Sequence, residues 1–285
     1  MSETETAILV QNLSHVYDDF KAVDEVSFSV ASGEVLGFLG PNGAGKSTTI
    51  KVLTGQVPLQ KGDVEILGMR RQDQRKAIQE RINVSFEEKN LYEDMSAKEN
   101  LEFFAKLYGV KNLDTEDLLR RVGLSDRMKD RVDSFSKGMR QRLMIARALV
   151  NKPDVLFLDE PTDGLDPVSA KAVRELIRQE AQRGCAVMLT THDMMEADNL
   201  ATRVAFINHG KIIAIDTPQN LKQKYGKRSI RVCYENGEEK HIALDTPEAA
   251  NDVAKAVKEP GLLSVHTEEA TLEDIFVELA GQELD

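Results

Sequence analysis

The stretch Gly40-Pro41-Asn42-Gly43-Ala44-Gly45-Lys46-Ser47 fits the pattern G-x-x-x-x-G-K-[ST] and decides the fold prediction. It follows a strand predicted over residues 35–39 and precedes a predicted helix. Glycines let the backbone curl so that several N–H groups point toward phosphate, and the start of the helix favours an anion. In this pattern the Lys46 ammonium reaches the outer phosphates and the Ser47 hydroxyl ligates Mg²⁺. A glycine-rich turn without a ligand is the alternative, but the strand–loop–helix context favours a phosphate site.

A second motif carries two adjacent carboxylates. Residues 155–158 form a short all-apolar run, typical of a strand that is buried on both faces of a parallel sheet. Asp159 and Glu160 follow directly. Beside a phosphate loop, we expect Asp159 to hold Mg²⁺ through a water molecule and Glu160 to polarise an attacking water as general base. Alone, the pair fits an acidic helix cap equally well; together with the phosphate loop it indicates hydrolysis.

The alternation of strands and helices predicts an α/β fold built on the phosphate-binding loop. Residues from about 88 to 152 have a helical pattern, with a capping box at Ser96-Ala97-Lys98-Glu99, and form an inserted helical subdomain. After Gly226 the pattern changes to a hairpin, a helix, a strand and a closing helix. We therefore expect two domains, residues 1–225 and 226–285, the second a small α+β domain. Strands are predicted at residues 8–10, 26–30, 35–39, 64–67, 82–86, 155–158, 186–190, 204–208, 211–215, 229–234, 240–244 and 262–266.

The composition limits the possible partners. The 285 residues carry a formal net charge of −11, which argues against nucleic acid or an anionic lipid surface as the main partner. No run approaches the roughly 18 apolar residues of a transmembrane helix, and the acidic start Met1-Ser2-Glu3-Thr4-Glu5 lacks the order of a signal peptide. We expect a cytoplasmic polypeptide that does not insert into the membrane and reaches it only through another protein. Cys185 and Cys233 are expected to be packing residues, with a disulfide or a metal site as the alternative.

The order of these motifs resembles that in the ATP-binding subunits of ABC transporters, over about residues 6–220. Phe135-Ser136-Lys137-Gly138-Met139 is similar to the signature of that family, which is usually Leu-Ser-Gly-Gly-Gln. Its second and fourth residues match, and Arg140-Gln141-Arg142 follows as expected, whereas the other three residues depart from the consensus. The resemblance implies an ABC ATPase core with ATP and Mg²⁺ as ligands.

The resemblance also assigns individual roles. Tyr17 corresponds to an aromatic residue that packs against adenine, Gly164-Leu165-Asp166 to a loop that crosses the dimer interface, and His192 to a switch histidine that contacts the γ-phosphate. Without the resemblance, Tyr17 and His192 would be ordinary strand-end residues and Asp166 a helix cap. The expected ATP-binding residues are Tyr17, Gly40, Pro41, Asn42, Gly43, Ala44, Gly45, Lys46, Ser47 and Thr48; the expected catalytic residues are Glu160, His192 and Lys46, and the expected metal ligands are Ser47, Asp159 and Glu87.

The helix predicted from Lys137 to Asn151 separates the signature from the phosphate loop of the same chain. At about 1.5 Å per residue its ends lie roughly 20 Å apart, and its far end leads to the strand that carries Asp159. Ser136, Lys137, Gly138 and Met139 are therefore expected to act on a second subunit, as in the head-to-tail dimer of the family, which closes over two ATP molecules. A homodimer is the simpler case because this chain carries every motif.

A membrane permease is the other partner that the resemblance implies. It would dock near the helical subdomain and hold the protein at the inner face of the cell membrane. Leu272-Glu273-Asp274-Ile275-Phe276 is similar to the tails of prokaryotic ABC exporter subunits for drugs, lipids, polysaccharides or sodium, which favours export over import. Specificity for the cargo is expected to reside in the permease.

Three other functions share parts of this pattern. An ABC ATPase that acts on ribosomes would carry two such domains in tandem, and one that acts in DNA repair would carry a long coiled coil before the signature. A P-loop kinase would share Gly40–Ser47 but would need neither the signature nor Glu160 beside Asp159. Co-purification with a membrane protein would distinguish a transporter subunit from all three.

The clearest departure from the family pattern concerns a Mg²⁺ ligand. Aligned on Phe86 and Leu91-Tyr92, Glu87 stands where transporter ATPases usually have a glutamine that binds Mg²⁺ and transmits the nucleotide state to the permease. The alternative is a solvated acidic loop that also includes Glu88. A carboxylate is a good hard ligand for Mg²⁺, but it repels the γ-phosphate when the metal is absent.

We therefore predict that ATP binding by the natural protein depends more steeply on Mg²⁺ than ATP binding by the variant Glu87→Gln. The variant should still hydrolyse ATP. Magnesium titrations of ATP affinity on both proteins test this prediction. Superimposable curves would mean that Glu87 never reaches the metal.

Overall fold

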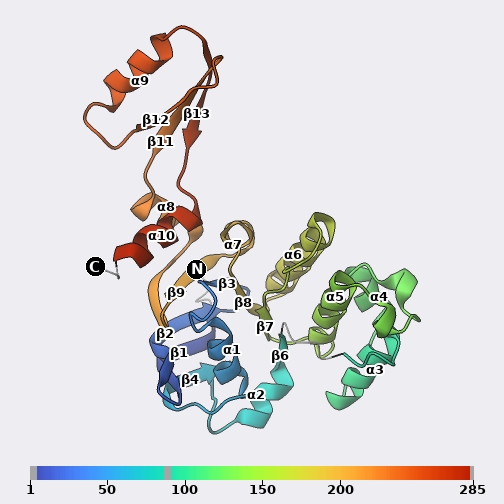
Figure 1. The fold of residues 1–285 in the computed structure, drawn as a ribbon. Helices are drawn as coiled ribbons and strands as arrows, with labels where there is room; N and C mark the ends of the chain where they lie inside the picture. The colour runs from blue at the N-terminus through green and yellow to red at the C-terminus, as the bar shows by residue number, and fades with distance from the viewer. Residues whose placement is uncertain (1–4, 87–90, 283–285) are drawn as a thin grey trace. The chain divides into compact units, whose positions relative to one another are not determined.

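The computed structural model describes residues 5–86 and 91–282. The chain forms two compact units, one up to Ile215 and one from Asp216 onward (Figure 1). The predicted domain boundary followed residue 225, which placed helix α8 (Pro218–Tyr225) in the ATPase domain. In the structure α8 contacts α10 (Leu272–Gln282) and belongs to the second unit.

The centre of the first unit is a six-stranded sheet with the order β10-β9-β3-β8-β7-β6. Its middle strands β3 (Val35–Leu39), β8 (Ala186–Thr191) and β7 (Val155–Asp159) are parallel and buried along their whole length. Burial on both faces explains why these strands are nearly continuous apolar runs in the sequence. The remaining strands are β6 (Ile82–Ser85), β9 (Arg203–Asn208) and β10 (Lys211–Asp216).

A four-stranded antiparallel sheet with the order β2-β1-β4-β5 shares a hydrophobic core with this sheet. β1 (Thr6–Tyr17) and β2 (Phe20–Ala31) are much longer than the strands predicted at residues 8–10 and 26–30. Their pairing contains several register shifts, and Asn12 has a positive φ of 52°. Such bulges break the two-residue alternation on which strand prediction depends, so the sequence revealed only fragments. The other two strands are β4 (Lys61–Ile66) and β5 (Met69–Arg70).

Helix α1 (Lys46–Thr54) follows the phosphate loop and fills the space between the two sheets with Ile50 and Leu53. Helix α6 (Pro167–Gln182) begins at the predicted Asp166-Pro167 cap. Two helices, α2 (Arg75–Arg81) and α7 (Met194–Leu200), were not predicted. Each spans only seven residues, too few for a helical period to stand out.

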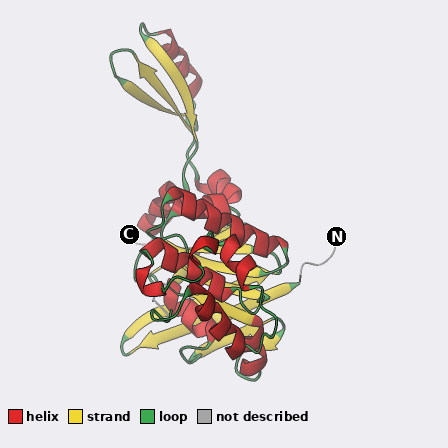
Figure 2. Ribbon diagram, turned by 90° about the vertical axis from the view of Figure 1, so that its right-hand side faces the viewer, coloured by secondary structure: helices red, strands yellow, loops and turns green. Residues whose placement is uncertain are grey.

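Among its described residues, the inserted helical subdomain contains three α-helices, of which the first and the last begin at the predicted helix starts Ser96 and Lys137. Helix α3 begins at the predicted capping box, in which Ser96 and Glu99 exchange hydrogen bonds. The side chains of the three helices form a common core that includes Leu101, Leu119 and Leu143. Figure 1 shows the three helices as labelled ribbons, and Figure 2 shows the same ribbon from another side with helices and strands in different colours. The elements are α3 (Ala97–Leu107), α4 (Thr115–Arg121), the short 3₁₀ turns η1 (Ser125–Arg127) and η2 (Val132–Ser134), and α5 (Lys137–Ala148).

The second unit contains a three-stranded antiparallel sheet with the order β12-β11-β13. Helix α9 covers one face of the sheet, and Tyr234 anchors it by donating a hydrogen bond from its hydroxyl to the carbonyl of Ala256, at 2.9 Å. Its elements are α8, β11 (Ser229–Tyr234), β12 (Glu239–Ala243), α9 (Ala249–Lys258), β13 (Leu262–Glu268) and α10. Within the described parts of the chain, no helix is both long enough and apolar enough to cross a bilayer.

We predict that a chain ending at Ile215 folds and binds ATP with an affinity within about twofold of the full chain. The reason is that every predicted nucleotide-binding residue lies in the first unit. Circular dichroism and ATP titration of both proteins test the prediction. A folded truncated protein without affinity for ATP would contradict it.

Candidate functional site

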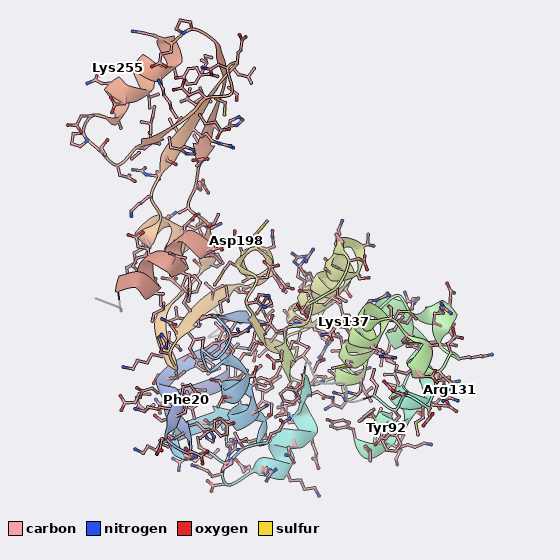
Figure 3. All side chains as sticks on the ribbon, viewed as in Figure 1. Phe20, Tyr92, Arg131, Lys137, Asp198 and Lys255 are labelled. Atoms are coloured by element: carbon pink, nitrogen blue, oxygen red, sulfur yellow. The ribbon has the colours of Figure 1, made fainter. Side chains whose placement is uncertain are left out.

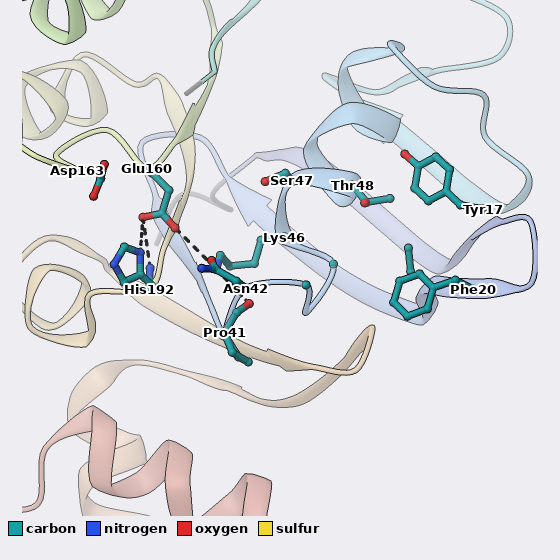
Figure 4. A pocket seen from close by; sticks show the side chains of 13 residues that line it. Tyr17, Phe20, Pro41, Asn42, Lys46, Ser47, Thr48, Glu160, Asp163 and His192 are labelled. Atoms are coloured by element: carbon teal, nitrogen blue, oxygen red, sulfur yellow. Dashed lines mark hydrogen bonds and ion pairs between the residues drawn. The ribbon is translucent and has the colours of Figure 1, made fainter. Parts of the chain in front are cut away.

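A pocket of about 390 Å³ lies where the carboxyl ends of β3, β7 and β8 meet (Figure 4). Its volume lies within the range of small-molecule sites, roughly 300–1,000 Å³. The lining residues are Tyr17, Phe20, Ala22, Pro41, Asn42, Gly43, Gly45, Lys46, Ser47, Thr48, Glu160, Asp163 and His192. Gly40 and Ala44 belong to the same loop but are buried. The structure thus brings residues of the phosphate loop, the acidic pair and the strand end of β8 into one cavity.

Two positions of the phosphate loop require glycine. A Cβ atom on Gly40 would lie 2.1 Å from the carbonyl oxygen of Ile207. Gly45 has a positive φ of 107°, and its Cβ would lie 2.3 Å from the carbonyl oxygen of Ala22. The loop therefore packs directly on its neighbouring backbone, and its conformation is fixed before a ligand arrives.

The Lys46 side chain is 6% exposed and spans the loop. Its Nζ donates to the carbonyl oxygens of Gly40 at 2.6 Å and Pro41 at 3.3 Å, and lies 3.7 Å from Glu160 Oε1. Burial lowers the pKa of Lys46, and the carboxylates of Glu160 and Asp159 offset part of this effect. The ammonium group is thus held in the lining of the pocket by two carbonyl oxygens of the loop and by Glu160.

The Ser47 hydroxyl and the Asp159 carboxylate, two possible metal ligands, meet beside Lys46. The Ser47 hydroxyl donates to Asp159 Oδ1 at 3.2 Å, and the Thr190 hydroxyl donates to the same oxygen. A hydroxyl and a carboxylate are the hard ligands that Mg²⁺ uses when substrate phosphates supply the others. Ser47 and Asp159 therefore fit a Mg²⁺ site, whereas the third predicted ligand, Glu87, lies outside the described residues.

Glu160 reaches the pocket through an uncommon backbone conformation. It directly follows β7 and has a φ of 49°, in the left-handed region that non-glycine residues rarely adopt. Its Oε2 lies 3.0 Å from His192 Nδ1 and accepts a hydrogen bond from the His192 backbone N–H at 3.4 Å. The strained backbone and the histidine together fix the carboxylate opposite the phosphate loop, as Figure 4 shows.

Two exposed aromatic residues line the end of the pocket away from Glu160 (Figure 4). Tyr17 ends β1 and Phe20 begins β2, and the tight turn between these strands makes them paired neighbours. The buried His15 supports the Tyr17 ring by an edge contact, with ring centroids 4.6 Å apart. The sequence analysis predicted Tyr17 as an adenine contact but missed Phe20. The position of Phe20, just beyond a two-residue turn after Tyr17, was a local signal that could have identified it.

The signature residues and Asp166 lie elsewhere. Among the described residues, the lining of this pocket includes neither Ser136, Lys137, Gly138 and Met139 nor Asp166. Ser136 caps α5, where its hydroxyl accepts from the Met139 N–H at 3.2 Å. Asp166 caps α6, and the hydrogen bonds that it accepts from Ser169 and Val168 lower its pKa.

One further lining residue was not predicted from the sequence, and one residue that the sequence analysis named without a role proves to contact the site. Asp163 lines the pocket from the loop after Glu160. Gln141 of α5 donates from Nε2 to the carbonyl oxygens of Glu160 and Pro161, both at 3.3 Å. Gln141 thus ties the signature helix to the loop that carries the catalytic candidate.

A phosphate loop that meets acidic strand ends in a parallel sheet defines a P-loop nucleotide-binding protein. The comparisons with known proteins narrow this class. The model of the ABC transporter family matches residues 23–163. The chain is 42% identical to a fluoroquinolones export ATP-binding protein of Mycobacterium tuberculosis, over 92% of this chain and 89% of the relative. It is 33% identical to a linearmycin resistance ATP-binding protein of Bacillus subtilis, over 96% and 98%.

A solved structure supports the same assignment. The ATP-binding subunit of an ABC transporter superposes with a TM-score of 0.71 and 30% identity, over 77% of this chain and 93% of that one. The chain therefore belongs to the ATP-binding subunits of ABC transporters. The predicted fold class, nucleotide binding and ATPase class are confirmed.

We predict that Gly43→Ala lowers the free energy of unfolding by about 1–2 kcal/mol, because Gly43 has a positive φ of 82°. No steric cost is expected in addition, since the new Cβ would meet no described atom within 4 Å. Gly45→Ala should cost more, since the Ala22 carbonyl must also move. Denaturant unfolding and ATP titration of both variants test the order. Equal losses would contradict the steric role of Gly45.

Proposed function

We propose that this protein hydrolyses ATP as a head-to-tail homodimer and thereby drives export through a separate membrane permease. The names of the curated relatives support export, since they include a fluoroquinolones export protein and a Nod factor export protein. The observation that carries the proposal is the position of Glu160, held by His192 and 3.7 Å from the Lys46 ammonium in the lining of one pocket. This position allows a general base to act next to a bound phosphate.

The residues of the pocket suggest how ATP would be held. Tyr17 and Phe20 offer exposed rings against which adenine can stack. The backbone N–H groups of residues 41–48 and the Lys46 ammonium would bind the β- and γ-phosphates. Ser47 and Asp159 would hold Mg²⁺, which neutralises charge on these phosphates.

The chemical step requires a water molecule beside the γ-phosphate. The water oxygen forms a bond to phosphorus, the bond from phosphorus to the β–γ bridging oxygen breaks, and Glu160 accepts a proton from the water. His192 would keep the Glu160 carboxylate in place through the 3.0 Å contact with Oε2. Lys46 would stabilise the negative charge that develops on the leaving ADP.

A second subunit would complete the site. The twelve residues of α5 extend over roughly 17 Å, and Ser136 caps the end that lies outside the pocket lining. Among the described residues, none of the signature lines the nucleotide pocket of its own chain, although the Lys137 side chain reaches Asp163 of that lining. Pairing two chains head to tail would place each signature over the ATP of the other chain.

We predict that Glu160→Gln lowers ATP turnover by about 10²–10⁴-fold and leaves ATP affinity nearly unchanged, because the base is lost while the phosphate contacts remain. The variant should accumulate as an ATP-bound dimer in gel filtration. Glu175→Gln, which removes an exposed carboxylate on α6, is the matched control. Near-normal hydrolysis by Glu160→Gln would refute the role of Glu160.

A further inference from the structure

Lys137 occupies a position where the family signature usually has glycine. It is the first residue of α5, directly after the cap Ser136 (Figure 3). The positive end of a helix dipole disfavours a cation at this position. The first turn of α5 also lacks an acidic residue that would compensate for the charge. The start of α5 therefore concentrates positive charge and favours an anion beside it.

Within its own chain, Lys137 pairs with an anion of the nucleotide pocket. Its Nζ lies 2.8 Å from Asp163 Oδ2. The lysine side chain runs over Gly164, where a Cβ atom would lie 2.6 Å from Nζ and 3.1 Å from Cε. A larger residue at position 164 would require the end of the lysine side chain to shift, so the glycine accommodates the observed contact.

The partner of Lys137, Asp163, links the signature to the nucleotide pocket of the same chain. Asp163 lines the same pocket as Lys46, Glu160 and His192, and Figure 4 shows it beside Glu160 and His192. Lys137 belongs to the signature, which would contact the nucleotide of the other subunit. One ion pair therefore joins the nucleotide site of its own chain to the surface that would serve the neighbouring site.

The ion pair is suited to exchange. The side chains of Lys137 and Asp163 are 66% and 36% exposed, and ion pairs at such exposure contribute little to stability. A triphosphate carries several negative charges, and its hydrogen bonds to an ammonium group are charge-assisted. A phosphate brought to the start of α5 would thus compete successfully with a single carboxylate.

We propose that Lys137 exchanges Asp163 for the outermost phosphate of the ATP that the second subunit holds. This inference rests on the head-to-tail dimer of the proposed function. The exchange adds a cation to the site in the other chain and leaves the Asp163 carboxylate without this cation beside its own pocket. ATP in one site thereby changes the charge around the other site, and the coupling acts equally in both directions.

Dimer formation by the full chain tests this proposal in the Glu160→Gln background. Adding Lys137→Gln should raise the ATP concentration for half-maximal dimerisation about tenfold, or about 1.4 kcal/mol. ATP binding by dilute, separated subunits, measured in parallel, reports the separate effect of leaving Asp163 without its cation beside the pocket of its own chain, and this effect should be smaller than tenfold because the ion pair is exposed. Lys98→Gln is the matched control, since Lys98 is an exposed lysine in the first turn of α3 with its own partner, Glu102. The Glu160→Gln protein that also carries Lys98→Gln should dimerise like the protein with Glu160→Gln alone.

A variant with the two charges swapped distinguishes phosphate binding by Lys137 from a purely structural role of its ion pair with Asp163. The double substitution Lys137→Asp with Asp163→Lys restores an ion pair within the chain but places a carboxylate against the phosphate. We expect it to dimerise poorly; full dimerisation would show that the ion pair itself is what matters and would overturn the proposal. Equal dimerisation with and without Lys137→Gln would also overturn it. Failure of Glu160→Gln alone to dimerise would instead contradict the proposed function.

Discussion

The parallel pairing of three strands is the constraint on which the site depends. β8 pairs with β3 on one side and β7 on the other, and the register sets Asp159 opposite Thr190. The hydrogen bond from the Thr190 hydroxyl to the Asp159 carboxylate reinforces this register at the carboxyl ends of the two strands. A shift of one strand by one residue would turn Asp159 into the core and move Glu160 away from His192. The chemistry of the pocket is thus a consequence of backbone pairing deep in the sheet.

Helix α5 extends this constraint to the helical subdomain. Its apolar residues pack into the core that α3 and α4 share, and its Gln141 amide holds the backbone just beyond β7. Its cap residue Ser136 carries the signature at the N-terminus of the helix, close to the loop that follows β7. A rigid rotation of α5 would therefore strain the Gln141 hydrogen bonds. The helix forms a mechanical connection between the pocket of one chain and the surface that would meet the other.

The features that the sequence predicted well are those with local causes. The phosphate loop needs glycine for its own conformation, and the Ser96 and Asp166 caps satisfy neighbouring N–H groups, so each leaves a pattern within a few residues. Asp163 was missed because an aspartate in the loop after Glu160 forms no pattern of its own, whereas Phe20 was missed although the two-residue turn after Tyr17 gave a local signal. The extent of β1 and β2 was missed because bulges interrupt their alternation, and α7 because it is short. The roles of the site residues remain predictions.

The left-handed backbone of Glu160 has an evolutionary consequence. A non-glycine residue at φ 49° costs the folded state about 1–3 kcal/mol, which glycine would largely avoid. Selection for stability alone would therefore favour replacement of this side chain. Under the proposed role of Glu160 as general base, the same replacement would abolish turnover, so selection on turnover and selection on stability would act against each other at this position. A laboratory screen for stable variants of this protein would then need an activity assay at every round.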